Sequence, residues 1–145
     1  MAQVPIAEGV FTWPSESPQL IGSRCTACGI VTFPTQDSCP RCASTEMEEH
    51  LLPRTGRLWA WTTQDFPPPS PPYAGPTGKE FVPFGVGYVA LGDEVKVETR
   101  LTETDADALT PGTEMELVIV PFRTGGGEDG TDEVVTFAFR PVGSA

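Results

Sequence analysis

The stretch Arg24-Cys25-Thr26-Ala27-Cys28-Gly29, followed by Ser38-Cys39-Pro40-Arg41-Cys42, decides the first part of the fold. It has the pattern C-x2-C-x10-C-x2-C and contains all 4 cysteines of the chain. Two residues between cysteines let one tight turn direct both sulfur atoms toward a common centre, and two facing turns supply the corners of a tetrahedron around zinc. Gly29 suits the positive φ that such a turn often needs. The spacing predicts a rubredoxin-like zinc ribbon with one Zn²⁺ held by Cys25, Cys28, Cys39 and Cys42.

A zinc ion with four protein sulfurs has no open position for water or substrate, so the site is expected to be structural. Two alternatives are a pair of disulfides and an iron ion bound as in rubredoxins. A reducing cytoplasm disfavours the disulfides. Arg24 and Arg41 flank the ligands, where they either offset the negative charge of the tetrathiolate or are ordinary surface residues.

The chain is strongly acidic, with 9 Lys plus Arg against 20 Asp plus Glu and a net charge of −11. A field of that sign repels phosphate groups, which disfavours nucleic acid and anionic membrane surfaces as partners. The N-terminus lacks the basic start and apolar core of a signal peptide, and no apolar run approaches a membrane span. We therefore expect a cytoplasmic protein with no membrane partner.

Beyond the ribbon, short alternating segments predict five strands, at residues 57–64, 85–91, 95–101, 114–120 and 134–139. Thr104, followed by Asp107 three residues later, resembles a helix-capping box, so a short helix is expected before Pro111. Residues 45–53 are predicted to be a linker, and residues 124–132 a hairpin loop. Trp59 and Trp61 have the same parity in their strand and are expected in the barrel interior, with an interface face as the alternative.

Five strands with a helix between the third and the fourth is the order of an OB-fold barrel. The predicted fold class is therefore mainly β. It comprises an N-terminal lead-in (residues 1–19), a zinc ribbon (20–52) and a five-stranded OB-fold domain with one short helix (53–145).

The first two predicted barrel strands are separated by a proline-rich segment, residues 66–83. Prolines lose little conformational entropy on binding, and large apolar side chains lie beside them. One interpretation is an element that docks a partner or lines a substrate site, and the other is a stiff loop that covers the barrel edge. The candidate lining residues are Phe66, Tyr73, Phe81 and Phe84.

No catalytic residue set is found. A Cys–His nucleophile needs a spare thiol, and the metal site takes all 4. The only histidine, His50, is interpreted as a solvated surface residue. Nucleophile-elbow, zinc-protease and phosphate-loop motifs are absent from the sequence.

The ribbon, followed by "RTGRLWAWTTQDFPPPSPPY" (54–73), "VPFGVGYVAL" (82–91), "VETRLTETDADALTPGTEMEL" (97–117) and "TFAFRPVG" (136–143), resembles the acyl-CoA-associated zinc-ribbon plus OB-fold family, long catalogued as a domain of unknown function. The resemblance implies an accessory subunit that forms a hetero-oligomer with a thiolase-like enzyme, a thiolase or a retro-aldolase. The substrates implied are steroid, aromatic or fatty acyl-CoA thioesters. Catalytic residues would belong to the partner, and this subunit would complete or stabilise the partner's substrate and CoA site.

Two other functions fit parts of the sequence. Zinc-ribbon OB-fold modules also bind single-stranded nucleic acid, and Trp59, Trp61 and Tyr88 are aromatic residues of the kind that stack on bases. The net charge of −11 argues against this alternative. An electron carrier with iron at the cysteines is the third function.

Overall fold

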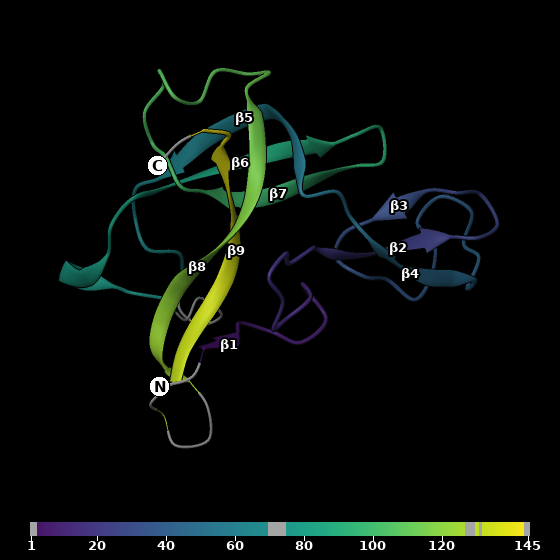
Figure 1. The fold of residues 1–145 in the computed structure, drawn as a ribbon, viewed down its shortest axis with the longest axis horizontal. Coiled ribbons are helices and arrows are strands. Elements are labelled where there is room, and N and C mark those ends of the chain that lie inside the picture. The colour runs from purple at the N-terminus through teal and green to yellow at the C-terminus, as the bar shows by residue number, and fades with distance from the viewer. Residues whose placement is uncertain (1–2, 70–74, 127–129, 131, 144–145) are drawn as a thin grey trace.

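The computed structural model describes residues 3–69, 75–126, 130 and 132–143 of the chain. Its architecture is almost entirely β, with a small three-stranded sheet beside a larger sheet that closes on itself (Figure 1). The strands in these ranges are β1 (Gln3–Pro5), β2 (Ile21–Cys25), β3 (Val31–Thr32), β4 (Met47–Leu51), β5 (Thr55–Gln64), β6 (Phe84–Leu91), β7 (Val95–Leu101), β8 (Glu114–Gly126) and β9 (Asp132–Pro141). A short 3₁₀ helix, η1 (Gly78–Glu80), precedes β6.

The small sheet is the ribbon, with the strand order β3-β2-β4 and antiparallel pairing throughout. Between the two cysteine pairs, the ribbon has only β3, two residues long. The linker expected at 45–53 is wrong, because β4 pairs along the whole of β2, from Ile21 opposite Leu51 to Cys25 opposite Met47. The polar sequence of β4 gave no strand signal, since this edge strand has no buried residue.

The five strands β5, β6, β7, β9 and β8 form the closed barrel that the sequence predicted. Closure comes from the β5–β8 pairing around Gly56 and Met115, and from a parallel contact between Leu101 of β7 and Phe139 of β9. The hairpin β8–β9 continues beyond the barrel as a long arm, and β1 runs parallel to its outer part (Figure 1). Part of the hairpin loop expected at 124–132 lies outside the described residues, and the described part extends both strands.

The core fills the barrel and continues beneath the ribbon. Its largest fully buried side chain is Phe139. The ribbon contributes Val31, and the segments on either side of it contribute Phe11, Leu20 and Leu52. Burial of these apolar side chains is the main term that stabilises the fold. The ribbon and the barrel therefore share one core.

The short helix expected from Thr104 is wrong: the structure has a single turn there. The N–H groups of Ala108 and Leu109 both donate to the carbonyl of Asp105, and the Asp105 side chain accepts from the N–H of Asp107. The cap is therefore Asp105 rather than Thr104. Leu109 is 1% exposed and anchors the turn in the core, and Pro111 follows too soon for a second turn to form.

The prediction that both tryptophans face the interior is wrong for Trp59, which is 57% exposed. The β5–β6 register shifts between Leu58 and Ala60, so Trp59 is the extra residue of a β-bulge. Beyond the bulge, the alternation of inward and outward side chains is shifted by one residue. Leu58 and Trp61 therefore both face inward, although they are an odd number of positions apart. Trp59 instead packs edge-on against Tyr88, with the Lys96 ammonium 4.4 Å from its ring centroid.

Candidate functional site

The four cysteines lie on two turns of the same design. In the first, the carbonyl of Cys25 accepts from the N–H of Gly29, and its sulfur accepts from the N–H of Cys28. In the second, the carbonyl of Cys39 accepts from Ala43, and its sulfur accepts from Arg41 and Cys42. Both turns end with a positive φ, +83° at Gly29 as the sequence predicted and +63° at Ala43.

The two turns bring the four Sγ atoms within 4.8 Å of one another. Cys25 Sγ lies 3.6 Å from Cys42 Sγ, and Cys28 Sγ lies 3.5 Å from Cys39 Sγ. Zinc–sulfur bonds of about 2.3 Å in a tetrahedron require sulfur–sulfur edges of about 3.8 Å. The donor set and its spacing therefore fit a tetrahedral zinc ion, and all four predicted ligands meet at one point.

Backbone donors prepare two of the sulfurs for a metal. The N–H of Cys28 lowers the pKa of the Cys25 thiol below its usual value. Burial raises the pKa of Cys39, but the N–H groups of Cys42 and Arg41 outweigh it and lower that pKa to about 6. The N–H of Ser44 favours the thiolate of Cys42, yet contact with the Cys25 sulfur raises the pKa of Cys42 to about 12. A metal ion must therefore displace the proton that Cys42 retains.

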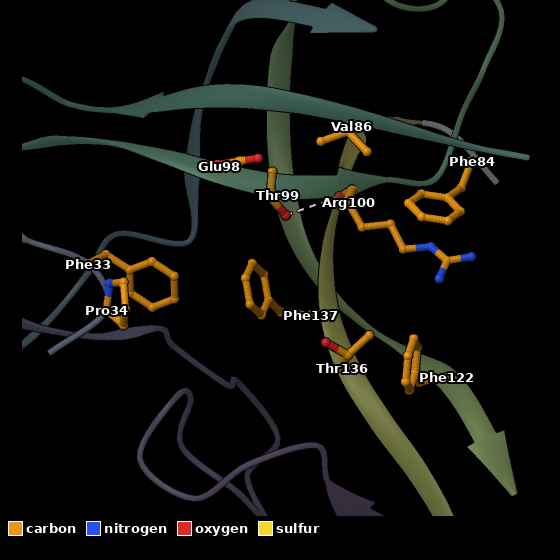
Figure 2. Close-up of a pocket in the computed structure, with 10 residues that line it drawn as sticks. All are labelled: Phe33, Pro34, Phe84, Val86, Glu98, Thr99, Arg100, Phe122, Thr136 and Phe137. Atoms are coloured by element: carbon orange, nitrogen blue, oxygen red, sulfur yellow. Dashed lines mark hydrogen bonds between the residues drawn. The ribbon is translucent and has the colours of Figure 1, made fainter. Parts of the chain in front are cut away.

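A pocket of about 480 Å³ lies where the ribbon meets the barrel (Figure 2). The ribbon supplies Phe33 and Pro34, and Phe33 packs edge-on against Phe137 of β9, with their ring centroids 5.6 Å apart. Phe84 and Phe122 line the pocket further along the barrel. The remaining lining residues belong to β6, β7 and β9, and they are Val86, Glu98, Thr99, Arg100 and Thr136.

The predicted lining residues of the proline-rich segment have different surroundings. Phe84 lies in the pocket wall, and Phe81 contacts it with their ring centroids 6.0 Å apart. Phe66 is 77% exposed and does not line the pocket. Tyr73 lies outside the described residues. Of the predicted lining residues that the structure describes, Phe84, at the start of β6, therefore lies in the pocket wall, and Phe81 contacts it.

Sequence reasoning missed Phe33, Arg100, Phe122 and Phe137 as pocket residues. Phe33 and Phe137 looked like ordinary apolar residues of two strands separated by a hundred positions. Only the packing of the ribbon on the barrel brings them together. In β9, the alternation of Phe137 and Phe139 with Ala138 could have drawn attention to Phe137. Alternation alone, however, cannot distinguish a side chain of the core from one that lines a pocket.

His50, on β4, lies at the junction between the ribbon and the barrel. Its side chain is 28% exposed, and its Nε2 contacts the carboxylate of Glu94 in the turn between β6 and β7. The surface histidine therefore has a carboxylate partner from the barrel. In the described part of the chain, no helix has the length and hydropathy needed to cross a membrane.

The fold and the metal centre define a zinc-ribbon OB-fold protein. Two family models match the chain, the rubredoxin-like zinc ribbon domain of ChsH2 over residues 16–48 and the C-terminal OB-fold domain of ChsH2 over residues 49–120. The chain belongs to this ChsH2 (DUF35) family.

Several relatives match over most of their length. A DUF35 domain-containing scaffold protein of Methanothermobacter thermautotrophicus is 30% identical over 139 residues, covering 93% of this chain and 96% of that protein. The benzoylsuccinyl-CoA thiolase subunit BbsA of Thauera aromatica is 28% identical over 126 residues, covering 87% of this chain and 78% of BbsA. Among solved structures, a chain of the Ltp2-ChsH2(DUF35) aldolase superposes with a TM-score of 0.53 at 22% identity, covering 81% of this chain and 84% of that chain, which supports the fold.

Proposed function

We propose that this chain is a non-catalytic accessory subunit of a thiolase-like enzyme that acts on acyl-CoA thioesters. The observation that carries the proposal is the similarity to a benzoylsuccinyl-CoA thiolase subunit, which extends over 87% of this chain. The scaffold proteins among the relatives support a role in assembly. The partner's substrate would be a steroid, aromatic or fatty acyl-CoA, and its reaction thiolysis or retro-aldol cleavage.

The chemistry of the chain supports a role without catalysis. Thiolysis needs a nucleophile and a proton acceptor, usually a thiol paired with histidine. All 4 cysteines of the sequence converge on the metal centre, and the only histidine is engaged with Glu94. The chain would hold one structural zinc ion, and the reacting groups would come from the partner.

The surface around the proline-rich segment supports a docking role. Phe66 and Val82 are 77% and 71% exposed, and the half-buried rings of Phe81 and Phe84, on either side of Val82 in the sequence, have centroids 6.0 Å apart. Exposed aromatic side chains of this kind are enriched in the centres of protein interfaces. We therefore place the partner-facing or substrate-lining surface at Phe66, Phe81 and Phe84, and extend it to Tyr73 by sequence.

Association with a partner tests this function. The chain is co-expressed with a thiolase-like protein of the same organism, and the mixture is analysed by size-exclusion chromatography with light scattering. We expect one hetero-oligomeric species, whose formation is weakened by Phe66→Ser. An exposed substitution far from this surface, Glu48→Gln on β4, serves as the control. Two separate species at micromolar concentrations would contradict the proposal.

A further inference from the structure

The outer face of the barrel carries two exposed aromatic side chains that are not part of the core. Trp59 of β5 is 57% exposed and Tyr88 of β6 is 41% exposed. Their rings meet at 82°, with centroids 6.1 Å apart, and we call this pair of rings the aromatic corner. Trp59 faces outward because of the β-bulge between Leu58 and Ala60, and bulges are frequent beside functional sites, where they re-aim a side chain. Neither ring lines the pocket between the ribbon and the barrel, so the corner is a separate surface.

The aromatic corner offers flat apolar faces and hydrogen-bond donors. In the part of the chain that the structure describes, no partner accepts from the indole N–H of Trp59 or the phenol O–H of Tyr88. An indole nitrogen can only donate, so its ligand must supply acceptors. A proline-rich segment does so, because its extended polyproline II form leaves the carbonyls free and its proline nitrogens carry no hydrogen. Grooves lined by aromatic side chains are a common docking site for such segments.

The charges beside the aromatic corner narrow the choice of ligand. The Lys96 ammonium lies 4.4 Å from the centroid of the Trp59 ring, and this side chain is exposed. Glu98, which is opposite Tyr88 on β7, is exposed as well. With one cation, one carboxylate and a net charge of −11 on the chain, a run of phosphates gains no attraction here. A neutral segment with a single carboxylate at the Lys96 end suits these charges.

One segment of this chain has that chemistry. Pro67, Pro68 and Pro69 follow Phe66, and the exposed Asp65 precedes them. Residues 66–69 carry no charge and belong to no helix or strand, and Phe66, Pro67 and Pro69 are exposed. The segment therefore combines free acceptors, apolar rings and one carboxylate at its start.

A chain cannot lay this segment along its own aromatic corner. Trp59 and Gln64 both belong to β5, and their separation is about 17 Å at the rise of a strand. Residues 65–69 span about 15 Å as polyproline II, so a segment that turned straight back would bring only its end near Trp59. The side-chain amide of Gln64 also donates to the carbonyl of Phe66, which holds the start of the segment at the end of β5. A second copy of the chain has no such restriction.

We propose that the aromatic corner binds residues 65–69 of a second copy of this chain. The proline rings would pack on Trp59 and Tyr88, the indole N–H and phenol O–H would donate to carbonyls of the segment, and Asp65 would pair with Lys96. Exchange of segments between two copies gives a symmetric pair with two identical contacts, and the second contact forms at a high effective concentration. The inference goes beyond the proposed function and does not rest on it. A thiolase-like partner that takes the proline-rich segment would compete with this self-association.

Peptide binding tests the aromatic corner directly. The isolated, zinc-loaded chain is titrated with the capped peptide Asp-Phe-Pro-Pro-Pro, the sequence of residues 65–69, and backbone amide shifts are followed by NMR. We expect the shifts to lie in β5, β6 and β7 around the corner. Trp59→Ala should weaken binding about tenfold or more, as for other central tryptophans of interfaces. Leu51→Ala, which shortens an exposed apolar side chain of the ribbon, is the matched control and should bind as the parent does.

Matched peptides and a second variant identify the groups responsible. The peptide Asp-Phe-Ala-Ala-Ala should bind about tenfold more weakly, because it lacks the proline rings and the polyproline II preference. Asn-Phe-Pro-Pro-Pro should lose about threefold, the scale of a surface ion pair, and Lys96→Gln should lose the same factor with no further loss when the two changes are combined. Equal affinity of the proline and alanine peptides, or shifts outside the corner, would overturn the proposal. Amide spectra with the parent's dispersion verify the fold of each variant.

Self-association tests the identity of the occupant. Sedimentation equilibrium of the chain between about 10 µM and 1 mM should show a monomer that becomes a dimer. Trp59→Ala, and the double substitution Pro67→Ala with Pro69→Ala, should each leave a monomer throughout. A parent chain that stays monomeric, or dimers that persist in both variants, would overturn the proposal. A short oligothymidylate that shifts the corner amides more strongly than the proline peptide would also overturn it, in favour of nucleic acid.

The two proposals of this article concern different measurements. No thiolase-like partner is present in the peptide titration or the sedimentation experiment, so failure there leaves the accessory role standing. Conversely, failure to form a hetero-oligomer leaves peptide binding at Trp59 and Tyr88 unaffected.

Discussion

At the scale of single residues, the two turns of the metal centre differ in the residue that follows the second cysteine. The first turn has Gly29 at φ +83°, and the second has Ala43 at φ +63°. Among the described residues other than glycine, Ala43 alone has a positive φ. This left-handed conformation costs an L-residue with a Cβ roughly 1–2 kcal/mol of free energy, whereas it costs glycine almost nothing. The backbone of the second turn is therefore strained at Ala43.

Ala43→Gly should relieve this strain and raise the free energy of unfolding of the zinc-loaded protein by about 1 kcal/mol. Urea denaturation followed by circular dichroism measures the change. Ala27→Gly, an exposed substitution in the first turn where φ is not positive, is the matched control and should lower stability by about 0.5 kcal/mol. Equal losses for both variants would show that Ala43 is unstrained.

At the scale of elements, the bulge in β5 separates two tryptophans that the sequence places on one face. Trp59 lies outside, against Tyr88 and Lys96, and Trp61 packs against the core. Alternation along a strand indicates which side chains are buried only where the strand pairing is regular. Nothing in the local sequence Leu58-Trp59-Ala60 indicates the extra residue of the bulge.

Trp61→Ala should therefore cost about 3 kcal/mol or more of stability, because it removes a large side chain packed on the core. Trp59→Ala should cost no more than about 1 kcal/mol, the scale of a surface contact with a cation–π component. Chemical denaturation of the two variants side by side makes the comparison. Similar losses of stability in the two variants would contradict the placement of Trp59 outside the barrel and Trp61 against the core.

The ribbon is a second element whose state can be changed selectively. Its three short strands contain few core residues, so the metal centre is expected to supply much of its stability, as in small zinc domains. Removing the metal with a chelator should abolish the amide protection of β2 and β4 and release the Phe33 wall of the pocket.

Hydrogen exchange monitored by NMR measures the protection, and the ring signals of Phe137, which packs against Phe33, report the release of that wall. The expected result is loss of protection in β2 and β4 and altered Phe137 signals, with β8–β9 still protected. Cys39→Ser, which removes one ligand, should reproduce the chelated state. Unchanged protection of β2 after complete metal loss would contradict a metal-dependent ribbon.

At the scale of the whole molecule, the sequence determined the parts more clearly than their contacts. The strand expected at 95–101 coincides with β7, and the four cysteines expected to share a site have their sulfur atoms within 4.8 Å of one another. Both rest on local patterns, namely alternation and paired turns. The strand β4 and the turn at Asp105 were missed because tertiary pairing and a buried Leu109 override weak local signals.

The pocket shows the same limit for function. Its residues come from the ribbon, β6, β7, β8 and β9, and the contact between Phe33 and Phe137 depends on how the ribbon packs against the barrel. No periodicity encodes that packing. Of the four lining residues expected from the proline-rich segment, Phe84 alone lines the pocket among those described. The apolar residues near the prolines included one that lines this pocket, whereas the position of Arg100 in the lining depends on the fold.

The accessory role is tested most directly by turnover of an acyl-CoA thioester, measured for this chain alone, for its thiolase-like partner alone and for the two together. Because the four thiols converge on one site that fits a metal ion, we expect no turnover by the chain alone, little by the partner alone and full activity on mixing. Hydrolysis or cleavage of the thioester by the purified chain, or a partner that is fully active by itself, would contradict the account.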